Sequence, residues 1–384
     1  MRFLHTSDWH LGRTFHGAPL LDHQRQAVET MVDVVRSEGV QLVIVAGDLY
    51  DRQLPAADAV DALSTAVCEL RAAGATVVAI SGNHDSSTRV SFAEPVLGAA
   101  GVTIRGDAAS SGRPVVIDET GDGGPPVVVY PVPYLEPEVA RHRLGVPDTR
   151  SHDGLLRVAA DRARADLALR GPARSILVAH AFVAGGAACD SERALAIGGS
   201  AAVAMSCFDG FGYVALGHLH GRQVFGGGRV RYSGSPIAYS FSERAHTKSA
   251  WLVDMAPDGS TSAAAIALPV PRPLASLRGT IDELLADRAH DGDEQAWVQV
   301  VLTDPVLPPD AMARLRRRFP HTVSLLHDPP PRGGEAISYT DRVRDRSDLD
   351  LALDFVAHVT GAAPSAHEVT ELVAAVGSGG GPDR

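Results

Sequence analysis

Five short apolar stretches of this chain each run directly into a group of histidine, aspartate or asparagine residues. The stretches are residues 2–6, 41–46, 75–80, 175–179 and 213–216. Each has the length and composition of a buried strand, and the first three alternate with helical patterns at residues 21–38 and 55–73. This β-α-β-α-β order predicts an α/β fold with a parallel sheet, whose strands end together at one edge.

The polar groups at these strand ends contain seven side chains that can bind a metal. They are Asp8, His10, Asp48, Asn83, His180, His218 and His220. Taken singly, each group has an ordinary structural explanation, such as a polar turn after a strand or a capped core histidine. Because ligands bind beyond the carboxyl ends of parallel strands, five such groups together predict one shared site.

The chemistry of these side chains favours hard or borderline divalent ions. The set contains carboxylates, imidazoles and an amide but no thiolate, which suits manganese, magnesium or iron better than a structural zinc. Seven ligands are more than one ion needs, so we expect two ions with Asp48 as a bridging carboxylate. Two ions about 3.5–4 Å apart form a clamp for in-line displacement at phosphorus.

Three further residues lie beside these ligands in the sequence. His84 is not needed as a ligand, and we predict that it donates a proton to the departing oxygen or hydrogen-bonds to the phosphoryl group. Asp85 would hold the imidazole of His84 in one orientation. Asp51 would accept a hydrogen bond from a ligand imidazole and so support the metal site from outside.

Chain length and helix-breaking residues predict several domains. A chain of 384 residues is too long for one ordinary core, and the proline-rich residues 269–273 form the clearest boundary. We expect a domain of residues 1–268, a smaller α+β domain of residues 269–335 and a helical segment at residues 336–376. The glycine-rich residues 377–384 are expected to be disordered.

Composition gives weaker guidance on partners and compartment. The net charge of −11 argues against a nucleic-acid partner, although bound divalent ions invert the local sign. The widely spaced Cys68, Cys189 and Cys207 form no metal-type pair, and no signal peptide or membrane-spanning run is present. We therefore expect reduced thiols and a cytoplasmic protein. Lys248 is the only lysine, which we attribute mainly to the codon usage of a GC-rich genome.

Taken in order, the motifs resemble those of the calcineurin-like metallophosphoesterases. The matching stretches are Asp8-x-His10, Gly47-Asp48-x-x-Asp51, Gly82-Asn83-His84-Asp85, His180 and Gly217-His218-x-His220. The resemblance implies a four-layer α-β-β-α sandwich and two divalent metal ions, typically Mn²⁺, with Mg²⁺ or Fe²⁺ as alternatives.

Other stretches resemble one branch of that family, the SbcD-type bacterial double-strand-break nucleases. They are residues 4–12, Ser191-Glu192-Arg193, residues 232–236 and residues 240–243. This resemblance implies a DNA exonuclease on double-stranded ends and endonuclease on single-stranded or hairpin DNA, in repair, recombination and replication. It also implies a small domain that caps the DNA site. The expected assembly is a homodimer within a heterotetramer, with an SbcC-like ATPase of the SMC family on the C-terminal helices.

Other interpretations use the same residues. A small-molecule or phosphoprotein phosphatase would share the fold, but would not need a second domain and a terminal helix pair. A scaffold without metal would be expected to have lost ligand positions, and none is lost. The basic run at residues 314–318 is either a solvated helix face or a contact for DNA phosphates. The terminal helices dock either on a partner or on their own chain.

Overall fold

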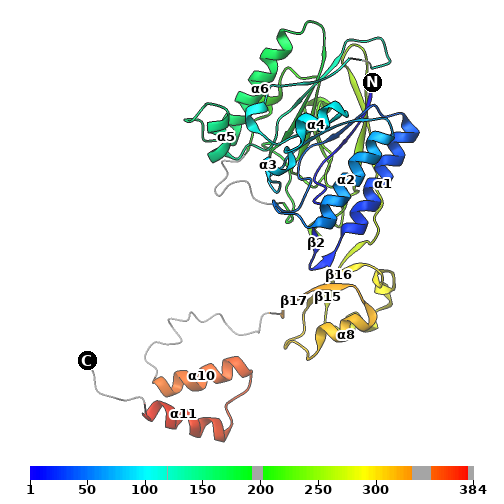
Figure 1. Cartoon of the computed structure of the whole chain (residues 1–384). Helices are drawn as coiled ribbons and strands as arrows, with labels where there is room; N and C mark the ends of the chain where they lie inside the picture. Colours follow the sequence, from blue (N-terminus) through cyan, green and yellow to red (C-terminus); the bar gives the residue numbers. More distant parts are fainter. Residues whose placement is uncertain (119, 193–201, 331–346, 379–384) are drawn as a thin grey trace. The chain divides into compact units, whose positions relative to one another are not determined.

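The computed structural model describes residues 1–118, 120–192, 202–330 and 347–378 (Figure 1). The chain divides into two compact units, Met1–Pro329 and Pro330–Arg384. The predicted boundary after residue 335 lies outside the described residues. None of the helices in the described residues is both long and apolar enough to cross a membrane.

The larger unit is built around two six-stranded sheets. In spatial order, the first contains β14 (Thr261–Ala267), β13 (Ser249–Met255), β1 (Arg2–Thr6), β4 (Leu42–Val45), β5 (Thr76–Ile80) and β6 (Val102–Arg105). The second contains β11 (Gln223–Phe225), β12 (Val230–Tyr232), β10 (Tyr213–Gly217), β9 (Arg174–His180), β8 (Val127–Pro131) and β7 (Val115–Ile117). The inner strands β1, β4 and β5 run parallel to one another, and so do β8, β9 and β10.

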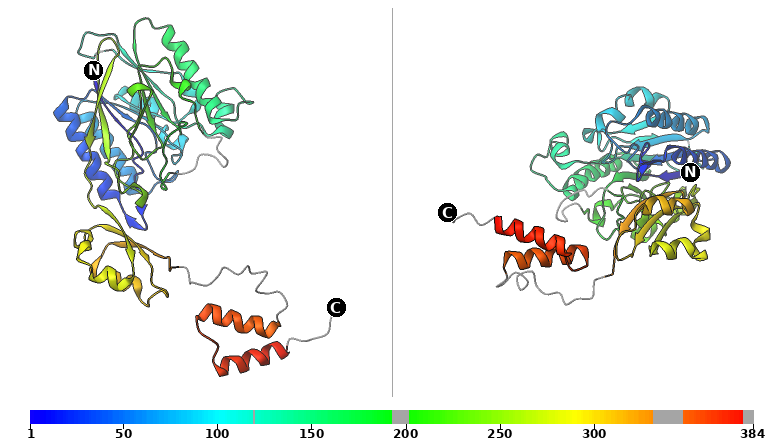
Figure 2. Two further views of the ribbon diagram at one scale, coloured as in Figure 1. Left: turned by 180° about the vertical axis from the view of Figure 1, so that it is seen from behind. Right: turned by 90° about the horizontal axis from the view of Figure 1, so that it is seen from below.

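The two sheets pack face to face and are covered by helices on their outer faces (Figures 1 and 2). Phe3, Ile44 and Val78 of the first sheet meet Val178 and Tyr213 of the second in a fully buried layer. The helices covering the first sheet are α1 (Leu21–Glu38) and α2 (Ala57–Ala72), and those covering the second are α5 (Pro137–Arg143) and α6 (His152–Ala168). The predicted α-β-β-α sandwich is therefore confirmed.

Two local predictions are corrected by the structure. We expected one helix over residues 87–100, but the chain forms two short helices, α3 (Ser87–Val90) and α4 (Glu94–Ala99). Pro95 lies in the first turn of α4, because proline lacks the N–H that a helix interior requires. The region of residues 131–147, which we expected to be a loop, contains the helix α5, and its Pro137 again stands at the helix start.

The smaller domain of this unit has a three-stranded parallel sheet of β15 (Leu274–Gly279), β16 (Trp297–Leu302) and β17 (Thr322–His327). The helices α7 (Ile281–Ala286) and α8 (Ala311–Arg318) share its core with Val300, Leu315 and Phe319. Trp297 also packs against Phe15, with ring centroids 6.0 Å apart, so the sheet contacts the main domain. Strand β15 was not predicted, because its short, mixed sequence directly follows the proline-rich linker.

Short elements complete the larger unit. They are the strands β2 (Thr14–Phe15) and β3 (Ala18–Pro19) and the 3₁₀ turns Ala108–Ser110, Met205–Phe208, Gly226–Gly228, Phe241–Glu243 and Arg288–Asp293.

The described part of the second unit is a helix pair, α10 (Asp348–Thr360) and α11 (Ala366–Ser378). Gly361 ends α10 in the left-handed region, at φ 72°. The three-residue spacing of Ser365 and Glu368 in the sequence predicts a capping box at the start of α11. The structure confirms it, since Ser365 N–H donates to Glu368 at 2.7 Å and Glu368 N–H donates to Ser365 Oγ at 3.3 Å. Helix α11 includes residues 377 and 378, which we expected to be disordered, and residues 379–384 lie outside the described part.

Candidate metal centre

The ends of five parallel strands bring all seven predicted ligands together. From the first sheet come Asp8 and His10 after β1, Asp48 after β4 and Asn83 after β5; from the second come His180 at the end of β9 and His218 and His220 after β10. A hydrogen bond of 3.0 Å from His218 N–H to Asp8 Oδ1 joins the two sheets at this edge. The ligands therefore converge because both sheets present their carboxyl ends to the same place.

One side of the centre contains Asp8, His10 and His220, whose ligand atoms lie within 4.8 Å of one another. The Nε2 atoms of His10 and His220 are 3.1 Å apart. Two nitrogen ligands placed about 2.1 Å from one ion at a right angle would be about 3.0 Å apart. The spacing of these two rings therefore fits a shared ion.

The other side contains His180, Asn83 and His218. His180 Nδ1 lies 2.9 Å from the carbonyl oxygen of Ala46, so in the neutral ring Nδ1 carries the proton and Nε2 has a lone pair. This Nε2 faces Asn83 Oδ1 at 2.9 Å and Asp48 Oδ2 at 3.4 Å, and His218 Nδ1 lies 3.3 Å from the same Asn83 oxygen. With the rings neutral, these nitrogen and oxygen atoms have lone pairs that face one another. A cation bound among them would accept a lone pair from each.

Asp48 lies between the two sides. Its Oδ2 is 3.5 Å from His10 Nε2 and 3.4 Å from His180 Nε2, while its Oδ1 accepts a hydrogen bond of 2.9 Å from His84 N–H. Asn83 Nδ2 and His10 Nδ1 are buried and have no hydrogen-bond partner in the structure. The residues present therefore fit divalent metal ions, with one carboxylate oxygen that faces both positions.

Burial controls the protonation of the imidazoles. It lowers the pKa of His218 to about 3 and also lowers the pKa values of His10 and His220, so these rings are neutral and able to bind a metal. Burial alone would lower the pKa of His180, but the adjacent Asp48 carboxylate outweighs it and raises that pKa to about 9. Burial alone would raise the pKa of Asp48, yet His180 and His10 hold it well below its ordinary value. The negative charge at the centre attracts a proton to His180, and a bound metal ion would replace that proton.

Two buried carboxyl groups have raised pKa values. Burial raises the pKa of Asp8 to about 7, with a further contribution from Asp48 and an opposing one from His180. Burial and the same Asp48 carboxylate raise the pKa of Asp85 to about 7. A cation bound beside Asp8 would favour its ionised, ligand-competent form.

The backbone at the centre is strained. Asp8, His10, Asp48 and His218 have positive φ angles of 54°, 45°, 51° and 104°, and only two other non-glycine residues in the described part share this feature. Such conformations cost roughly 1–3 kcal/mol each and cluster at functional sites. The strain points these four side chains inward, and nothing in the residue types alone reveals it.

Glycines allow the strand ends to approach one another closely. A methyl group added at Gly82 would lie 2.1 Å from Asp48 Oδ1, and one added at Gly217 would lie 1.8 Å from the carbonyl oxygen of Ala46. Glycine is required at both positions because any side chain would collide with these atoms. Backbone conformation is not the reason, since neither residue has a positive φ.

Replacing Gly82 with alanine is expected to lower the free energy of unfolding by about 1–3 kcal/mol and to weaken Mn²⁺ binding, because the new methyl group displaces the Asp48 carboxylate. Thermal unfolding and calorimetric Mn²⁺ titration measure both effects. Gly98→Ala is the matched control, since a methyl group there meets nothing within 4 Å. Wild-type stability and Mn²⁺ affinity in Gly82→Ala would show that the close approach is not required.

The role predicted for Asp85 is wrong in this structure. Its carboxylate does not contact His84 but accepts backbone N–H groups of Leu49, Tyr50 and Gly82 at 2.9–3.0 Å. Asp85 therefore joins the turns after β4 and β5 to each other. It differs from the expectation because neighbouring residues in a tight turn point in different directions.

His84 is oriented by Asp51, through the backbone. His84 Nδ1 lies 2.8 Å from the carbonyl oxygen of Asp51, so Nδ1–H donates and Nε2 remains available. The Asp51 carboxylate is 3.9 Å from the Nδ1 atoms of both His84 and His10, beyond hydrogen-bond length. The side chains of His84, His10 and Asp48 also form a group that could hold a metal, so metal content must be measured whenever His84 is changed.

Several residues that support the centre were not predicted from the sequence. Gln24 of α1, 1% exposed, donates to the carbonyl oxygen of His10 at 2.6 Å and accepts from Gly12 N–H at 3.1 Å, which fixes the loop after β1. A second group adjoins His220 and contains Ser191, Glu192, Glu243 and Lys248. The sequence did mark three of these residues. Ser191 and Glu243 lie in stretches that resemble the SbcD-type nucleases, and Lys248 is the only lysine, but neither feature indicated a role beside His220.

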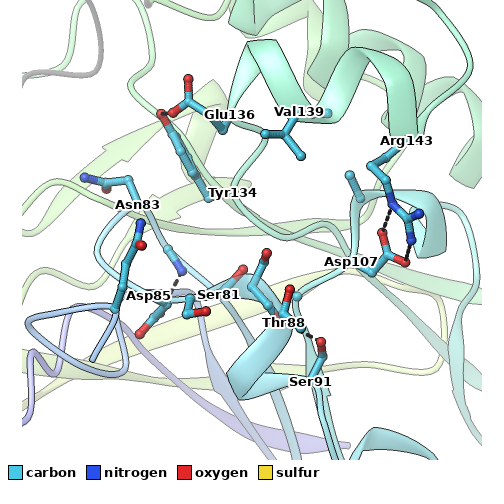
Figure 3. Close-up of a pocket in the computed structure, with 17 residues that line it drawn as sticks. Ser81, Asn83, Asp85, Thr88, Ser91, Asp107, Tyr134, Glu136, Val139 and Arg143 are labelled. Carbon is cyan, nitrogen blue, oxygen red and sulfur yellow. Dashed lines mark hydrogen bonds and ion pairs between the residues drawn. The ribbon is translucent and has the colours of Figure 1, made fainter. Parts of the chain in front are cut away.

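A cavity of about 560 Å³ opens beside Asn83 (Figure 3). Its walls carry hydroxyl groups from Ser86, Ser87, Thr88 and Ser91. Among its lining residues the only arginine or lysine is Arg143, which is ion-paired with Asp107. The cavity therefore offers hydroxyl, amide and carboxyl groups next to the metal centre, the carboxyl groups including those of Asp85 and Glu136.

Residues 1–222, more than half of the chain, match the family model described as calcineurin-like phosphoesterase. Residues 270–360 match the model SbcD_C, described as a type 5 capsule protein repressor C-terminal domain. The first match contains the whole set of predicted ligands, and the second covers the small domain and helix α10.

Solved structures that match this chain include TT1561 of Thermus thermophilus, with 15% identity, coverage of 69% of this chain and 98% of that chain, and a TM-score of 0.40. A dimetal phosphatase from Danio rerio has 15% identity, coverage of 70% and 99%, and a TM-score of 0.41. The calcineurin-like phosphoesterase YfkN from Bacillus subtilis has 11% identity, coverage of 70% and 90%, and a TM-score of 0.39.

Proposed function

The chain belongs to the calcineurin-like phosphoesterase family, and from this premise we propose that it is an SbcD-type, two-metal DNA exonuclease and endonuclease. The observation that carries the metal assignment is the convergence of imidazole, carboxylate and amide acceptors at the ends of both sheets. The match of residues 270–360 to the SbcD_C model supports DNA as the substrate. Mn²⁺ is the proposed ion.

When bound, two divalent ions would supply Lewis acidity, polarise the phosphoryl oxygens and lower the pKa of water. Asp8, His10 and His220 would hold one ion and Asn83, His180 and His218 the other, with Asp48 shared. His84 would donate a proton from Nε2 to the departing deoxyribose oxygen, because its Nδ1–H is already bound to the Asp51 carbonyl.

The surroundings of the centre suit an extended substrate. A second cavity, of about 460 Å³, is lined by Arg13 and Tyr239 of the main domain and by Gln299 of β16. The Tyr239 ring lies 5.2 Å from the His10 ring, so this cavity adjoins the centre. We propose that the small domain caps DNA here. The basic run at residues 314–318 on α8 is not part of this proposed DNA contact. Arg318 pairs with Asp291 and Glu294 of its own domain, which favours a role within the small domain.

The helix pair is the proposed docking site for an SbcC-like SMC-family ATPase. Phe355 is 67% exposed, Val359 59% and Val373 48%, although α10 and α11 contact each other. Exposed apolar residues on short helices are typical of surfaces that bind a partner. The acidic and basic residues 341–346, which we expected to form a polar rim, lie outside the described residues.

The remaining predictions are proposals of the same kind. We propose the domain limits 1–268, 269–335, 336–376 and 377–384, and a homodimer within a heterotetramer. The cysteines Cys68, Cys189 and Cys207 are all unpaired, which is compatible with the proposed location in a reducing cytoplasm.

Phe355→Asp combined with Val359→Asp is expected to weaken co-purification with the ATPase at least about tenfold, because a charge replaces an apolar anchor. The melting temperature and Mn²⁺-dependent activity should stay at wild-type values. Leu169→Asp, at an 88% exposed position of the larger unit, is the control and should bind normally. A chain truncated after Glu335 that loses stability but still binds the ATPase would contradict the docking role.

Labelled linear duplex and hairpin DNA with Mn²⁺, with and without the ATPase, test the proposed activity. Mn²⁺-dependent cleavage of DNA is the expected result. Hydrolysis of phosphomonoesters without cleavage of DNA would indicate the phosphatase alternative. Absence of both metal binding and hydrolysis would indicate a scaffold.

A further inference from the structure

The single lysine of the chain is buried beside the metal centre. Lys248 is 4% exposed, and its ammonium group forms an ion pair with the Glu243 carboxylate. It also donates to Ser235 Oγ at 2.9 Å and to the carbonyl oxygen of His220 at 3.0 Å. All three N–H groups therefore have acceptors, and one of those acceptors belongs to a proposed ligand.

Glu243, held in place by Lys248, also forms a hydrogen bond with Ser191. The carboxylate is 1% exposed and accepts from Tyr239 N–H at 3.0 Å and from Ser191 Oγ at 2.6 Å. An ionised carboxylate can only accept hydrogen bonds, so the Ser191 hydroxyl must be the donor. The rotation of that hydroxyl is thereby determined.

Ser191 in turn determines how the His220 ring presents its nitrogens. Ser191 Oγ lies 2.7 Å from His220 Nδ1. Since the hydroxyl proton is directed to Glu243, the oxygen accepts from Nδ1–H, and Nε2 keeps its lone pair. That Nε2 faces His10 Nε2 at 3.1 Å, where we place a metal ion.

We propose that Glu243 and Lys248 are positioning residues that act through Ser191 to hold His220 Nε2 toward the ion shared with Asp8 and His10. The proposal rests on the two-metal centre, but not on DNA as the substrate. The effect is confined to one of the two ions, because His180, Asn83 and His218 have no contact with Ser191, Glu243 or Lys248 in the described hydrogen bonds.

A purely structural ion pair is the competing explanation. Buried ion pairs can often be replaced by neutral residues without loss of stability, so the pair is weak evidence for a stabilising role. Lys248 also stands in a chain whose other lysine-or-arginine positions are all arginine. A planar guanidinium does not fit three acceptors that converge on one compact ammonium group, which explains why lysine stands here.

Ser191→Ala tests the proposal most cleanly, since it breaks the chain of contacts and leaves no charge unpaired. Calorimetric titration with Mn²⁺ should show one ion bound about 10–100-fold more weakly and the other unchanged. Ser191→Thr keeps the hydroxyl and should restore wild-type binding. Ser249→Ala is the matched control, because it removes a buried hydroxyl that contacts Arg222 and not His220.

Lys248→Met with Glu243→Gln removes both charges together and separates positioning from stability. We expect near-wild-type thermal unfolding of the metal-free protein but the same selective loss of one ion. Two ions bound with wild-type affinity in both this variant and Ser191→Ala would overturn the inference. If the wild-type protein itself binds no Mn²⁺, the metal centre fails, which is a distinct result.

Discussion

Replacing Asp48 with asparagine is expected to weaken the binding of both metal ions and to lower phosphodiesterase activity at least about a thousandfold. Oδ1 of this residue accepts His84 N–H at 2.9 Å, so the amide oxygen of the variant would stay there and its NH₂ group would face the centre. The lone pair that faces both His10 and His180 would be replaced by a donor. The Lewis acidity of the ions would stabilise the charge of the transition state by several kcal/mol, and losing about 4 kcal/mol of that stabilisation lowers the rate about a thousandfold.

His10→Ala is the companion variant, because His10 belongs to the group with Asp8 and His220. It should weaken mainly one ion, whereas Asp48→Asn weakens both. Metal content by mass spectrometry after equilibration with Mn²⁺ separates the two outcomes. Two ions per chain in Asp48→Asn would remove the bridging role.

Replacing His84 with alanine is expected to slow DNA cleavage by roughly 10²–10⁴-fold while DNA affinity and metal content stay at wild-type values. The deoxyribose alkoxide is a poor leaving group and needs a proton, which His84 Nε2 can supply since Nδ1 is held by the Asp51 carbonyl. Hydrolysis of a p-nitrophenyl ester should be less affected, because p-nitrophenolate leaves without a proton.

Metal content of the same variant separates acid catalysis from metal binding. His84 lies close enough to His10 and Asp48 to act as a ligand. Loss of one ion in His84→Ala would assign it as a ligand, and near-normal cleavage of DNA would exclude it from the mechanism.

The layered fold followed from local patterns. Apolar runs and helical periodicity placed β1 and α1 at the residues where the structure has them. Strand β15 was missed because its sequence mixes apolar and polar residues directly after the proline-rich linker, and its burial depends on pairing with β16. Pro95 indicates a helix start within residues 87–100, and the structure begins α4 there. The helix-forming residues around it favoured one continuous helix instead.

The identity of the site residues was accessible from the sequence because each follows a strand. Their hydrogen-bond partners were not, since the partners come from distant segments. Glu243 lies 3.7 Å from His220 Nδ1 and is joined to it by hydrogen bonds through Ser191, and Asp85 bonds to Leu49, 36 residues away, instead of to its neighbour. Contacts of this kind depend on which strands and loops become neighbours in the folded chain, which no local pattern encodes.

Anomalous X-ray scattering from a crystal soaked in Mn²⁺, recorded at the manganese absorption edge, tests the two-ion centre most directly. We expect two peaks about 3.5–4 Å apart. One should lie between His10 and His220, the other beside His180 and Asn83, with Asp48 touching both. A single peak, or peaks away from these strand ends, would contradict the account.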